Sequence, residues 1–533
     1  MDRAAETRRA QEVAEEQGCQ AIPPVQDPRW YHEAVGYEIF VRSFYDSDGD
    51  GIGDLAGILE KLDYLNDGDP ESGNDLGISL LWLMPTFPSP SYHGYDVSDY
   101  RGVNPDYGSL DDLRELVAEG QKRGIRVLLD LVLNHSSSLH PWFVDSTVPT
   151  SPLRNWYVWS EEPLDWKRPF GGAAATWHEA TENNYYYGIF WSGMPDLNYT
   201  SAAVRAEMTD IGRFWLEDVG IAGYRLDAVR YIVETGPDGL QDTPATMVWW
   251  EEFSGAMHAT QPEALLIGEA WASNSIAARY HVAGKGLDMT FDFDLMEAIV
   301  AGLLAEEPAD IENVLCSFAG QFPTDSGDAT FLSNHDLTRL ASRVKGRQEL
   351  LSLGAMLLFT LPGMPVIYYG QEIGMSNGPL LKDEHKRLPM QWEKTPNAGF
   401  TTGQPWLPVN DDFATVNVGT QLEDSGSLLT LYRKLIALRN SHRALRTGGF
   451  MPAKATAKTA YDVWGFVRAD TESSLAIYVN LSGTPALDAQ LDLPEGNYSA
   501  ASRVFPESAP AVLSGGVLLV GDVPAYSLTV HVL

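Results

Sequence analysis

Acidic side chains stand directly after several short apolar runs of this 533-residue chain. Asp227 ends one such run, Glu269 ends the next, and Asp336 follows a later one. Two carboxylates can cleave a glycosidic bond between them when one attacks the anomeric carbon and the other gives a proton to the leaving oxygen. If the fold collects these residues in one pocket, they predict that chemistry.

The apolar runs themselves are the candidate strands of a parallel sheet. They lie at residues 36–42, 80–84, 126–131, 223–227, 265–268, 287–291, 329–332 and 365–369. The segments between them include stretches with helical periodicity, such as the one that starts at the predicted helix cap Ser109. Eight alternating strand and helix units predict an α/β fold, a (β/α)8 TIM barrel. All strand carboxyl ends then meet at one rim, where Asp227, Glu269 and Asp336 would share a pocket.

The positions of Asp227 and Glu269 favour one mechanism. They end neighbouring strands about 5 Å apart, which suits the carboxyl separation of about 5–5.5 Å in retaining glycosidases. Arg225 lies two residues before Asp227, on the same strand face, and we expect its cation to keep Asp227 ionised. A single aspartate in such a run is more often a helix cap or a surface ion pair. The whole set is poorly explained in that way, so we interpret it as catalytic.

The chain outside the barrel pattern divides into three parts. Residues 1–29 are polar and predict an N-terminal tail. Residues 136–198 are crowded with Trp, Tyr, Pro and Gly, and they predict an inserted domain B after the third strand. The barrel then comprises residues 30–135 and 199–445. Short alternating strands over residues 446–533 predict a C-terminal antiparallel β-sandwich.

Composition excludes several partners. The 37 Lys and Arg residues against 73 Asp and Glu residues give a net charge of −36, whereas nucleic acid binding needs clustered cations. No apolar run reaches the roughly 18 residues of a membrane span. We therefore expect neither a nucleic acid nor a membrane partner. We also expect a monomer. The amino terminus lacks the apolar core of a signal peptide, and a secreted or periplasmic location stays open if a leader was trimmed. Two cysteines, Cys19 and Cys316, are too few for a disulfide framework or a zinc cluster.

Four segments resemble sequence regions of the α-amylase family, glycoside hydrolase family 13. They are DLVLNH (130–135), GYRLDAVRY (223–231), LIGEAW (266–271) and FLSNHD (331–336). MPDLN (194–198) and GMPVIYYGQEIGM (363–375) are similar to two supporting regions. The chain resembles in particular a group intermediate between α-amylases and oligo-1,6-glucosidases. The resemblance runs from about Trp30 to the carboxyl end and implies the barrel, domain B and the C-terminal β-sandwich.

The resemblance also implies roles for individual residues. Asp227 would be the nucleophile, Glu269 the general acid/base, and Asp336 the carboxylate that distorts the sugar and stabilises the transition state. Further matched positions would bind the glucose at the cleavage point: Tyr95, Asp96, His135, Arg225, His335 and Arg387. Tyr95 would stack on the sugar ring, with Asp96 beside it. Arg387 lies in KRLPMQW, which is similar to a segment of the oligosaccharide-acting members.

The acidic loop DSDGDGIGD (46–54) is a candidate calcium site. Positions 1, 3, 5, 7 and 9 of a calcium loop would be Asp46, Asp48, Asp50, Ile52 through its carbonyl, and Asp54. Position 12 is Gly57 instead of glutamate, so the loop is no EF-hand. A solvated acidic turn is the alternative. Oligo-1,6-glucosidase-like relatives carry a similar loop that binds calcium, so the resemblance implies a structural Ca²⁺ ion.

We therefore expect a retaining glycosidase that cleaves α-1,4-glucosidic bonds in starch or maltooligosaccharides through a covalent glucosyl-enzyme. A sugar hydroxyl that intercepts this intermediate would give transglycosylation. The alternatives are an α-glucosidase and a trehalose synthase-like transferase or isomerase. A non-catalytic carbohydrate-binding protein on the same fold is a more distant alternative, because the three catalytic carboxylates are present.

Overall fold

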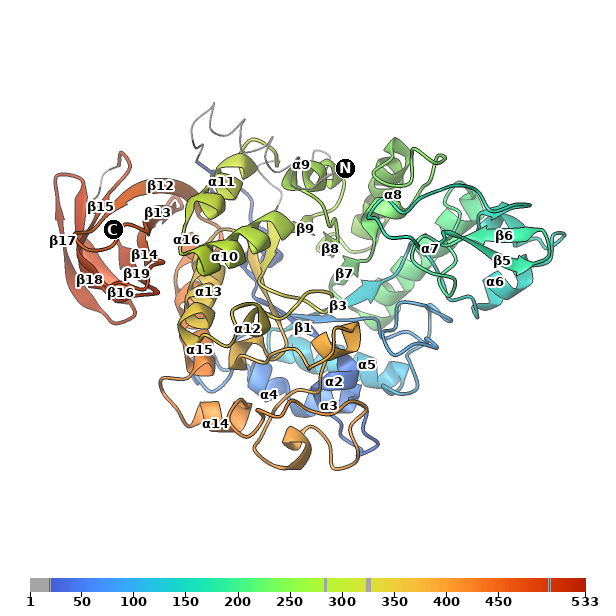
Figure 1. Cartoon of the computed structure of the whole chain (residues 1–533), viewed down its shortest axis with the longest axis horizontal. Coiled ribbons are helices and arrows are strands. Elements are labelled where there is room, and N and C mark those ends of the chain that lie inside the picture. The colour runs from blue at the N-terminus through green and yellow to red at the C-terminus, as the bar shows by residue number, and fades with distance from the viewer. Residues whose placement is uncertain (1–18, 20, 282–284, 323–326, 497, 499) are drawn as a thin grey trace.

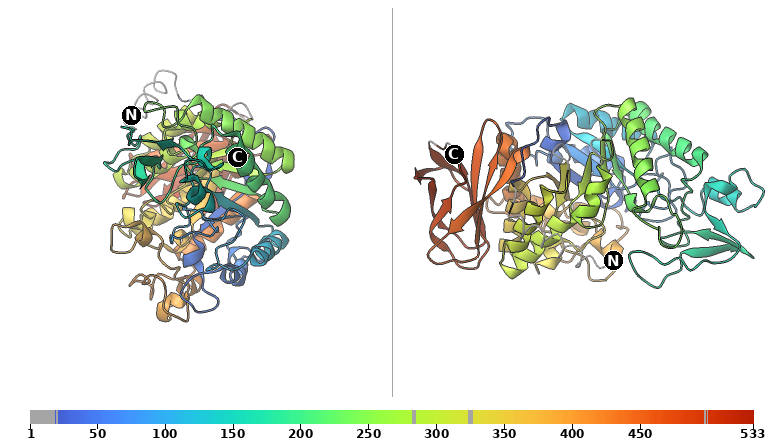
Figure 2. Two further views of the ribbon diagram at one scale, coloured as in Figure 1. Left: turned by 90° about the vertical axis from the view of Figure 1, so that its right-hand side faces the viewer. Right: turned by 90° about the horizontal axis from the view of Figure 1, so that it is seen from above.

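The structure of the protein, a computed structural model, has three parts in a row (Figures 1 and 2). A central α/β barrel lies between a C-terminal β-domain on one side and the inserted domain B on the other. The structure describes residues 19, 21–281, 285–322, 327–496, 498 and 500–533. Most of the predicted polar tail, residues 1–18 and 20, lies outside the described residues.

Eight parallel strands close into the central barrel, which confirms the predicted TIM barrel. They are β1 (Gly36–Ile39), β2 (Leu80–Leu83), β3 (Arg126–Leu131), β7 (Gly223–Leu226), β8 (Leu265–Gly268), β9 (Met289–Phe291), β10 (Gly327–Phe331) and β11 (Met364–Tyr368). Their order around the barrel is β1-β11-β10-β9-β8-β7-β3-β2. The run predicted over 36–42 ends early, because Val41–Phe44 forms the short helix α2.

Helices of very different length surround the barrel (Figure 1). The longer ones are α5 (Leu110–Lys122), α7 (Ala202–Phe214), α8 (Pro244–Thr260), α10 (Phe293–Ala305), α11 (Ala309–Phe318), α13 (Gln348–Thr360) and α15 (Leu428–Ser441). The shorter ones are α3 (Leu55–Glu60), α4 (Leu62–Leu65), α9 (Asn274–Ala277), α12 (Leu340–Arg343), α14 (Val418–Leu422) and α16 (Arg443–Arg446). Among the described residues, no helix is long and apolar enough to cross a membrane.

Helix α5 illustrates how local sequence sets these elements. The Ser109 hydroxyl accepts from the Asp112 backbone N–H at 3.2 Å, and the Asp112 carboxylate accepts from the Ser109 N–H at 2.7 Å. This reciprocal cap satisfies N–H groups that have no partner inside the helix. Leu113, Leu116 and Val117 form the buried face of the helix. The predicted cap at Ser109 therefore marks the start of α5.

Domain B lies between β3 and α7. It contains α6 (Pro141–Ser146) and an antiparallel sheet of β4 (Trp159–Ser160), β6 (Asn184–Tyr187) and β5 (Trp177–Thr181), in that order. Trp177 and Tyr187 are buried in a small core of their own. Trp191, in contrast, is 45% exposed. Most aromatic side chains of this segment therefore hold domain B together, and a few face outward.

The C-terminal domain is antiparallel, as predicted, and its strand order closes on itself. The strands are β12 (Gly449–Thr456), β13 (Val463–Ala469), β14 (Ser474–Asn480), β19 (Ser527–Val532), β16 (Ala501–Phe505), β17 (Ala509–Ser514), β18 (Val517–Val523) and β15 (Ala486–Asp492), in spatial order. The buried Arg468 on β13 donates to the carbonyls of Thr360 at 2.8 Å and Gly448 at 2.7 Å. Thr360 ends α13, so this arginine joins the domain to the barrel.

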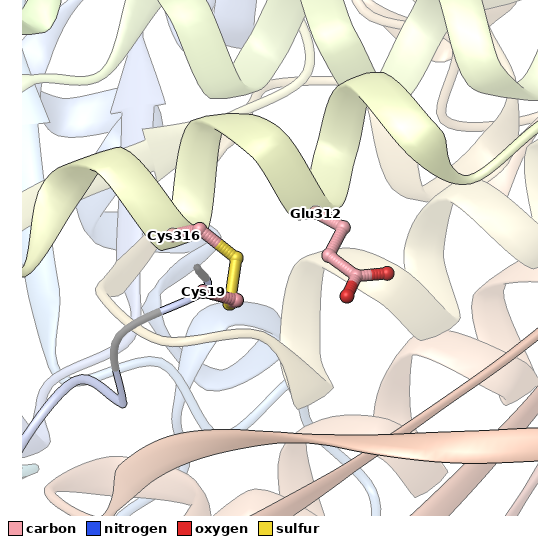
Figure 3. Close-up of side chains that lie close together, drawn as sticks. All are labelled: Cys19, Glu312 and Cys316. Atoms are coloured by element: carbon pink, nitrogen blue, oxygen red, sulfur yellow. A yellow bond between two sulfur atoms is a disulfide. The ribbon is translucent and has the colours of Figure 1, made fainter. Parts of the chain in front are cut away.

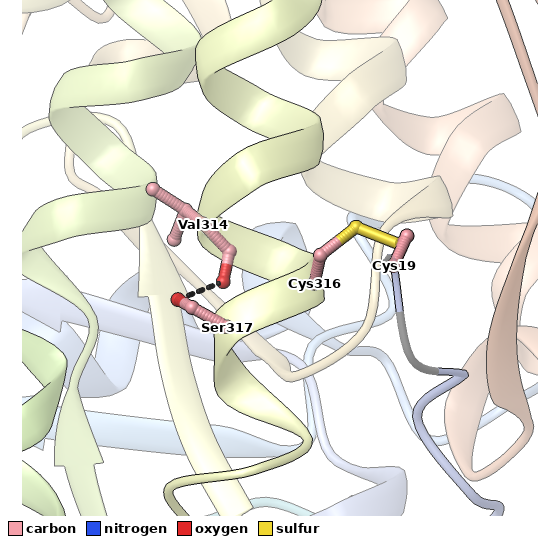
Figure 4. Close-up of a disulfide and its surroundings, with 4 residues drawn as sticks. All are labelled: Cys19, Val314, Cys316 and Ser317. Carbon is pink, nitrogen blue, oxygen red and sulfur yellow. Dashed lines mark hydrogen bonds between the residues drawn. A yellow bond between two sulfur atoms is a disulfide. The ribbon is translucent and has the colours of Figure 1, made fainter. Parts of the chain in front are cut away.

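The two cysteines form a disulfide, which the sequence did not predict. Cys19 in the N-terminal arm is joined to Cys316 on α11, on the same helix as Glu312 (Figures 3 and 4). Three residues further along, Ile22 exchanges two backbone hydrogen bonds of 2.9 Å with Phe450 of β12. The arm therefore contacts both a barrel helix and the C-terminal domain.

Candidate active site

A cavity of about 950 Å³ opens at the carboxyl ends of the barrel strands. Asp227 directly follows β7, Glu269 directly follows β8, and Asp336 lies in the segment after β10. Six of the sequence-predicted residues line this cavity: Tyr95, His135, Asp227, Glu269, Asp336 and Arg387. Residues more than 200 positions apart thus meet at one rim, as expected for a barrel.

Arg225 connects the two carboxylates that could share the bond-breaking steps. Its Nη1 atom lies 2.8 Å from Asp227 Oδ1, and its Nη2 atom lies 2.9 Å from Glu269 Oε2. The side chain is only 1% exposed and comes from β7. Because one guanidinium reaches both groups, Asp227 and Glu269 lie close together at the base of the cavity.

The protonation behaviour of Glu269 suits proton transfer near neutral pH. Burial raises the pKa of Glu269 to about 7, although Arg225 acts in the opposite direction. Burial also raises the pKa of Asp227 above its ordinary value, again against the effect of Arg225. The cation therefore limits a rise caused by burial and does not bring the Asp227 pKa below its usual range. A carboxyl with a pKa near the working pH can both give and take a proton.

Asp336 has the opposite electrostatic environment. Its Oδ2 atom lies 3.1 Å from His335 Nε2, and its Oδ1 atom accepts from Arg387 Nη2 at 2.9 Å. Burial alone would raise the pKa of Asp336, but these two cations outweigh burial and hold that pKa well below its usual range. Asp336 is therefore an anion at any pH near neutrality.

Tyr95 and His135 offer groups that a sugar could contact. The Tyr95 ring stacks against His335, with centroids 5.6 Å apart and an angle of 19° between the ring planes. Burial lowers the pKa of His135 to about 4, so its imidazole is neutral near pH 7. Within the described part of the chain, His135 Nε2 has no hydrogen-bond partner. Because His135 lines the cavity, a hydroxyl of a bound sugar would be a suitable partner for this nitrogen.

Three residues that were predicted to contact the sugar are not among the described residues that line the cavity. Arg225 and His335 are 1% and 0% exposed and lie beneath the cavity-lining residues. Asp96 is not among the described residues that line the cavity. Its carboxylate accepts from the Ser89 hydroxyl at 2.5 Å and the Ser91 hydroxyl at 2.7 Å, which orders the loop that carries Tyr95.

The sequence of this barrel matches one known catalytic domain over most of its length. The profile described as "Alpha amylase, catalytic domain" covers residues 38–448. The chain belongs to the α-amylase family. It is therefore a glycosidase, and its family implies an oligosaccharide substrate.

Named relatives of this α-amylase-family chain differ in their activities. "Alpha-amylase 3" of Dictyoglomus thermophilum is 38% identical over 429 residues, which cover 79% of this chain and 79% of that protein. "Trehalose synthase/amylase TreS" of Mycolicibacterium smegmatis is 36% identical over 478 residues, 80% of this chain and 78% of that protein. The crystal structure of the alpha-amylase from H. orenii has a TM-score of 0.82 and 37% identity, and it covers 94% of this chain and 99% of that chain.

Two site residues of this α-amylase-family protein were given no role from the sequence. The carboxylate of Asp130 on β3 accepts hydrogen bonds from Arg225 Nη1 at 2.8 Å and from the Tyr95 hydroxyl at 2.9 Å. Trp271 lines the cavity, is 39% exposed, and stacks on Phe293 with an angle of 7° between the rings. The sequence contained a feature that could have indicated each of these two residues. Asp130 is a charge inside an apolar strand, and Trp271 lies two residues after Glu269.

The four carboxylates of the predicted calcium loop do not all converge. Asp46, Asp48 and Asp50 each offer an oxygen within 4.8 Å of the others. Asp54 has another role in the structure, because its carboxylate accepts from the Gly57 N–H at 2.6 Å and caps α3. The backbone N–H of Ile52 donates to Asp50 Oδ1 at 2.7 Å. The loop therefore has three converging carboxylates, and Asp54 is not one of them.

Proposed function

We propose that this glycosidase is a retaining enzyme that cleaves α-1,4-glucosidic bonds in starch and maltooligosaccharides. The observation that carries the proposal is the arrangement of Asp227 and Glu269 on one guanidinium at the base of the cavity. Two adjacent carboxyl groups, one of them with a pKa near 7, are what a double-displacement reaction requires. The relatives named as amylases support the choice of substrate.

In the first step, the Asp227 carboxylate attacks the anomeric carbon of the bound glucosyl unit. The bond from that carbon to the leaving oxygen breaks, and Glu269 transfers its proton to this oxygen. The products are a glucosyl ester on Asp227, an ionised Glu269 and a released sugar. In the second step, Glu269 takes a proton from water while the water oxygen attacks the same carbon. The ester bond breaks, and both carboxyl groups return to their starting states.

Asp336 would act on the charge that develops in the transition state of each step. The transition state of glycoside cleavage resembles an oxocarbenium ion, so it carries positive charge at the sugar ring. Asp336 is held ionised by His335 and Arg387 and lines the same cavity. A fixed anion at this place stabilises the cationic ring without reorganisation during the reaction.

Glucosyl transfer is the second candidate activity. A sugar hydroxyl in place of water would convert the same glucosyl ester into a new glycoside. The relative named "Trehalose synthase/amylase TreS", at 36% identity, favours keeping this candidate. The chemistry at Asp227 and Glu269 is the same for both outcomes, so the acceptor decides between them.

Product analysis with starch, maltoheptaose and maltose tests the proposal. We expect maltooligosaccharides from starch and maltoheptaose, with glucose as a minor product. Glucose as the only product, with starch scarcely degraded, would contradict the amylase assignment in favour of an α-glucosidase. Trehalose formed from maltose would identify a transferase or isomerase.

We further propose that Asp46, Asp48 and Asp50 bind a structural Ca²⁺ ion. Oxygen ligands from carboxylates are those that this ion prefers. Burial, with the neighbouring Asp48 and Asp46 charges, raises the pKa of Asp50, and a cation would relieve this repulsion. The ion would order the loop between β1 and α3, and it takes no part in the steps above.

Removal of the metal tests this second proposal by thermal unfolding. An ion that binds only the folded state stabilises it, so exhaustive chelation should lower the Tm of the wild-type protein, and added Ca²⁺ should restore it. The D50N variant should have a lower Tm that no longer responds to chelation or to Ca²⁺. A wild-type Tm that is the same before and after chelation would contradict the assignment.

A further inference from the structure

Glu38 is a buried acid that the reaction described above does not use. It lies on β1, at the opposite side of the barrel order from β7 and β8, and is 1% exposed. Its Oε1 atom lies 2.6 Å from Nδ1 of His335, which is 0% exposed. The other ring nitrogen of His335, Nε2, lies 3.1 Å from Asp336 Oδ2. His335 thus stands between two carboxylates.

The hydrogen bonds around His335 determine where its protons are. The Tyr95 hydroxyl donates its one proton to Asp130 Oδ2 at 2.9 Å. The Tyr95 oxygen also lies 2.7 Å from His335 Nε2, so in this contact Nε2 must be the donor. On the other side, Nδ1 faces a carboxylate oxygen of Glu38, which can only accept when ionised. With Glu38 ionised, both ring nitrogens carry hydrogen and the ring is an imidazolium.

We propose that Glu38 is a positioning residue that keeps His335 charged and oriented, and that it thereby holds Asp336 ionised and directed at the substrate. This inference rests on the proposed function, because it assigns a purpose to the Asp336 anion. Glu38 never touches the substrate in this account. It acts through the imidazolium: one carboxylate fixes Nδ1, and the charged ring then lies with Nε2 3.1 Å from Asp336 Oδ2.

The other groups around His335 are consistent with this role. Asp336 and Glu38 together raise the pKa of His335 to about 9, although burial acts to lower it. The remaining charged neighbours act at longer range or on other atoms. Arg387 Nε donates to the backbone carbonyl of His335 at 3.0 Å, and Arg225 reaches the Tyr95 oxygen at 3.3 Å. Asp130, on β3, is the acceptor for Tyr95.

Glu38→Gln separates charge from shape. Glutamine has nearly the same size, and its amide oxygen can still accept from Nδ1. The variant therefore removes the anion while it preserves one hydrogen bond. Without that anion the imidazolium is easier to deprotonate, because an opposite charge within about 4–6 Å shifts a pKa by roughly 1–3 units. A neutral His335 has one N–H only and no longer offers Asp336 a positive charge.

The experiment is a histidine titration by NMR of the full-length, ¹⁵N-labelled protein. The His335 signal is identified among the 11 histidines as the one missing from H335N. In the wild type, His335 should remain an imidazolium at pH 8. In E38Q its titration should move to lower pH by at least about one unit, whereas E38D, which keeps the charge, should stay closer to the wild type.

Glu372→Gln is the matched control. Glu372 is equally buried in the barrel, and its carboxylate accepts from the hydroxyls of Tyr37 at 2.8 Å and Tyr64 at 2.7 Å. It makes no contact with His335 among the described hydrogen bonds and ion pairs. The E372Q variant should therefore leave the titration of His335 unchanged.

Kinetics provide a second readout that a packing role would not move. The ratio of kcat/KM for E38Q to that for the wild type should fall as the pH rises from 6 to 8, because only in E38Q does His335 lose its proton over this range. A ratio that is constant with pH, an unshifted His335 titration in E38Q, or a neutral His335 in the wild type at pH 8 would each overturn the inference.

The histidine titration does not depend on turnover. If no α-glucan were cleaved at all, the proposed function would fail while the protonation of His335 would still be decided.

Discussion

At the scale of single residues, three carboxyl groups of one cavity have three different environments. The pKa of Glu269 is about 7. Burial raises the pKa of Asp227 although the Arg225 cation acts to lower it, and the pKa of Asp336 lies well below its usual range. Such separation of pKa values assigns roles, because only a group that titrates near the working pH can exchange protons during turnover. Glu269 is therefore the residue that should set the pH dependence.

We expect kcat/KM to fall above about pH 7. Glu269 must be protonated to donate to the leaving oxygen, and its raised pKa means that it carries this proton below pH 7 and loses it above. A pH profile on maltoheptaose measures this, and the fall should approach tenfold per pH unit. The residual activity of E269Q should lack this alkaline limb. An identical limb in E269Q would show that another group is responsible.

The residue positions that sequence reasoning could find are those fixed by strand ends. Asp227 and Glu269 follow directly from the barrel, because each ends a strand on the common rim. Asp96 shows the limit. Its position in the chain places it next to Tyr95, but only the loop conformation turns its carboxylate toward Ser89 and Ser91. Asp130 was visible as a charge in a buried strand, yet its partners Arg225 and Tyr95 come from other elements.

At the scale of elements, the loops after the strands set what the cavity accepts. The loop after β8 carries Trp271, whose ring stacks on Phe293 at a centroid distance of 5.0 Å. Arg230 Nη1 donates to the Trp271 carbonyl at 2.6 Å and is itself paired with Asp242. This loop is therefore held in place before any sugar binds. Glu269, the proposed proton donor, lies two residues away, so we expect the Trp271 ring to lie on the side of the leaving sugar.

We predict that W271A weakens binding of the leaving sugar and of a sugar acceptor. An aromatic face contributes about 0.5–1.5 kcal/mol beyond the area that it buries, which is roughly a two- to tenfold change. The kcat/KM for maltoheptaose should fall by this factor, and transfer to an added sugar should fall more than hydrolysis does. Initial rates with and without acceptor measure both.

Y461A is a suitable control for this prediction. Tyr461 is 90% exposed and lies in the C-terminal domain, away from the cavity-lining residues. Its removal should leave both rates as they are. An equal loss in W271A and Y461A, or no loss in W271A, would contradict a role for the Trp271 ring in sugar binding.

The conformations of the loops could not be predicted from the sequence. The strands are predicted to within a few residues, because buried apolar runs and their spacing define them. The loops obtain their shapes from tertiary contacts such as Arg230 with Asp242. The acidic loop is an example, since Asp54 is spaced like a metal ligand but its position at the start of α3 makes it a helix cap.

At the scale of the whole molecule, the N-terminal arm links two parts of the chain. Cys19 joins the arm to α11, and Ile22 pairs with Phe450 on β12. The disulfide closes a sequence separation of 297 residues. A cross-link of this kind stabilises mainly by restricting the unfolded chain.

Reduction should therefore destabilise the protein without changing its active site. We expect the double variant C19S/C316S to lose about 2–4 kcal/mol of unfolding free energy, seen as a lower Tm, with kcat/KM at 25 °C unchanged. A reductant should lower the wild-type Tm and should not lower that of the double variant further. If the reductant acted equally on both proteins, the disulfide would not be the cause.

The net charge of −36 also belongs to this scale. Only a few acids are assigned to the catalytic cavity and the acidic loop, so most of the excess is spread elsewhere on the molecule. An uncharged glucan is not repelled by such a surface, whereas a polyanion would be. The charge thus agrees with a neutral oligosaccharide as substrate.

The proposed mechanism forms a covalent intermediate on Asp227, and peptide mapping by mass spectrometry can detect it. The protein is treated with a 5-fluoro-α-glucosyl fluoride, whose slow turnover lets the glucosyl ester accumulate, and is then digested. We predict one added fluoroglucosyl group on Asp227, with no such group in D227N. A label on Glu269 or Asp336 instead, or turnover of the fluoride with no covalent adduct, would contradict the mechanism.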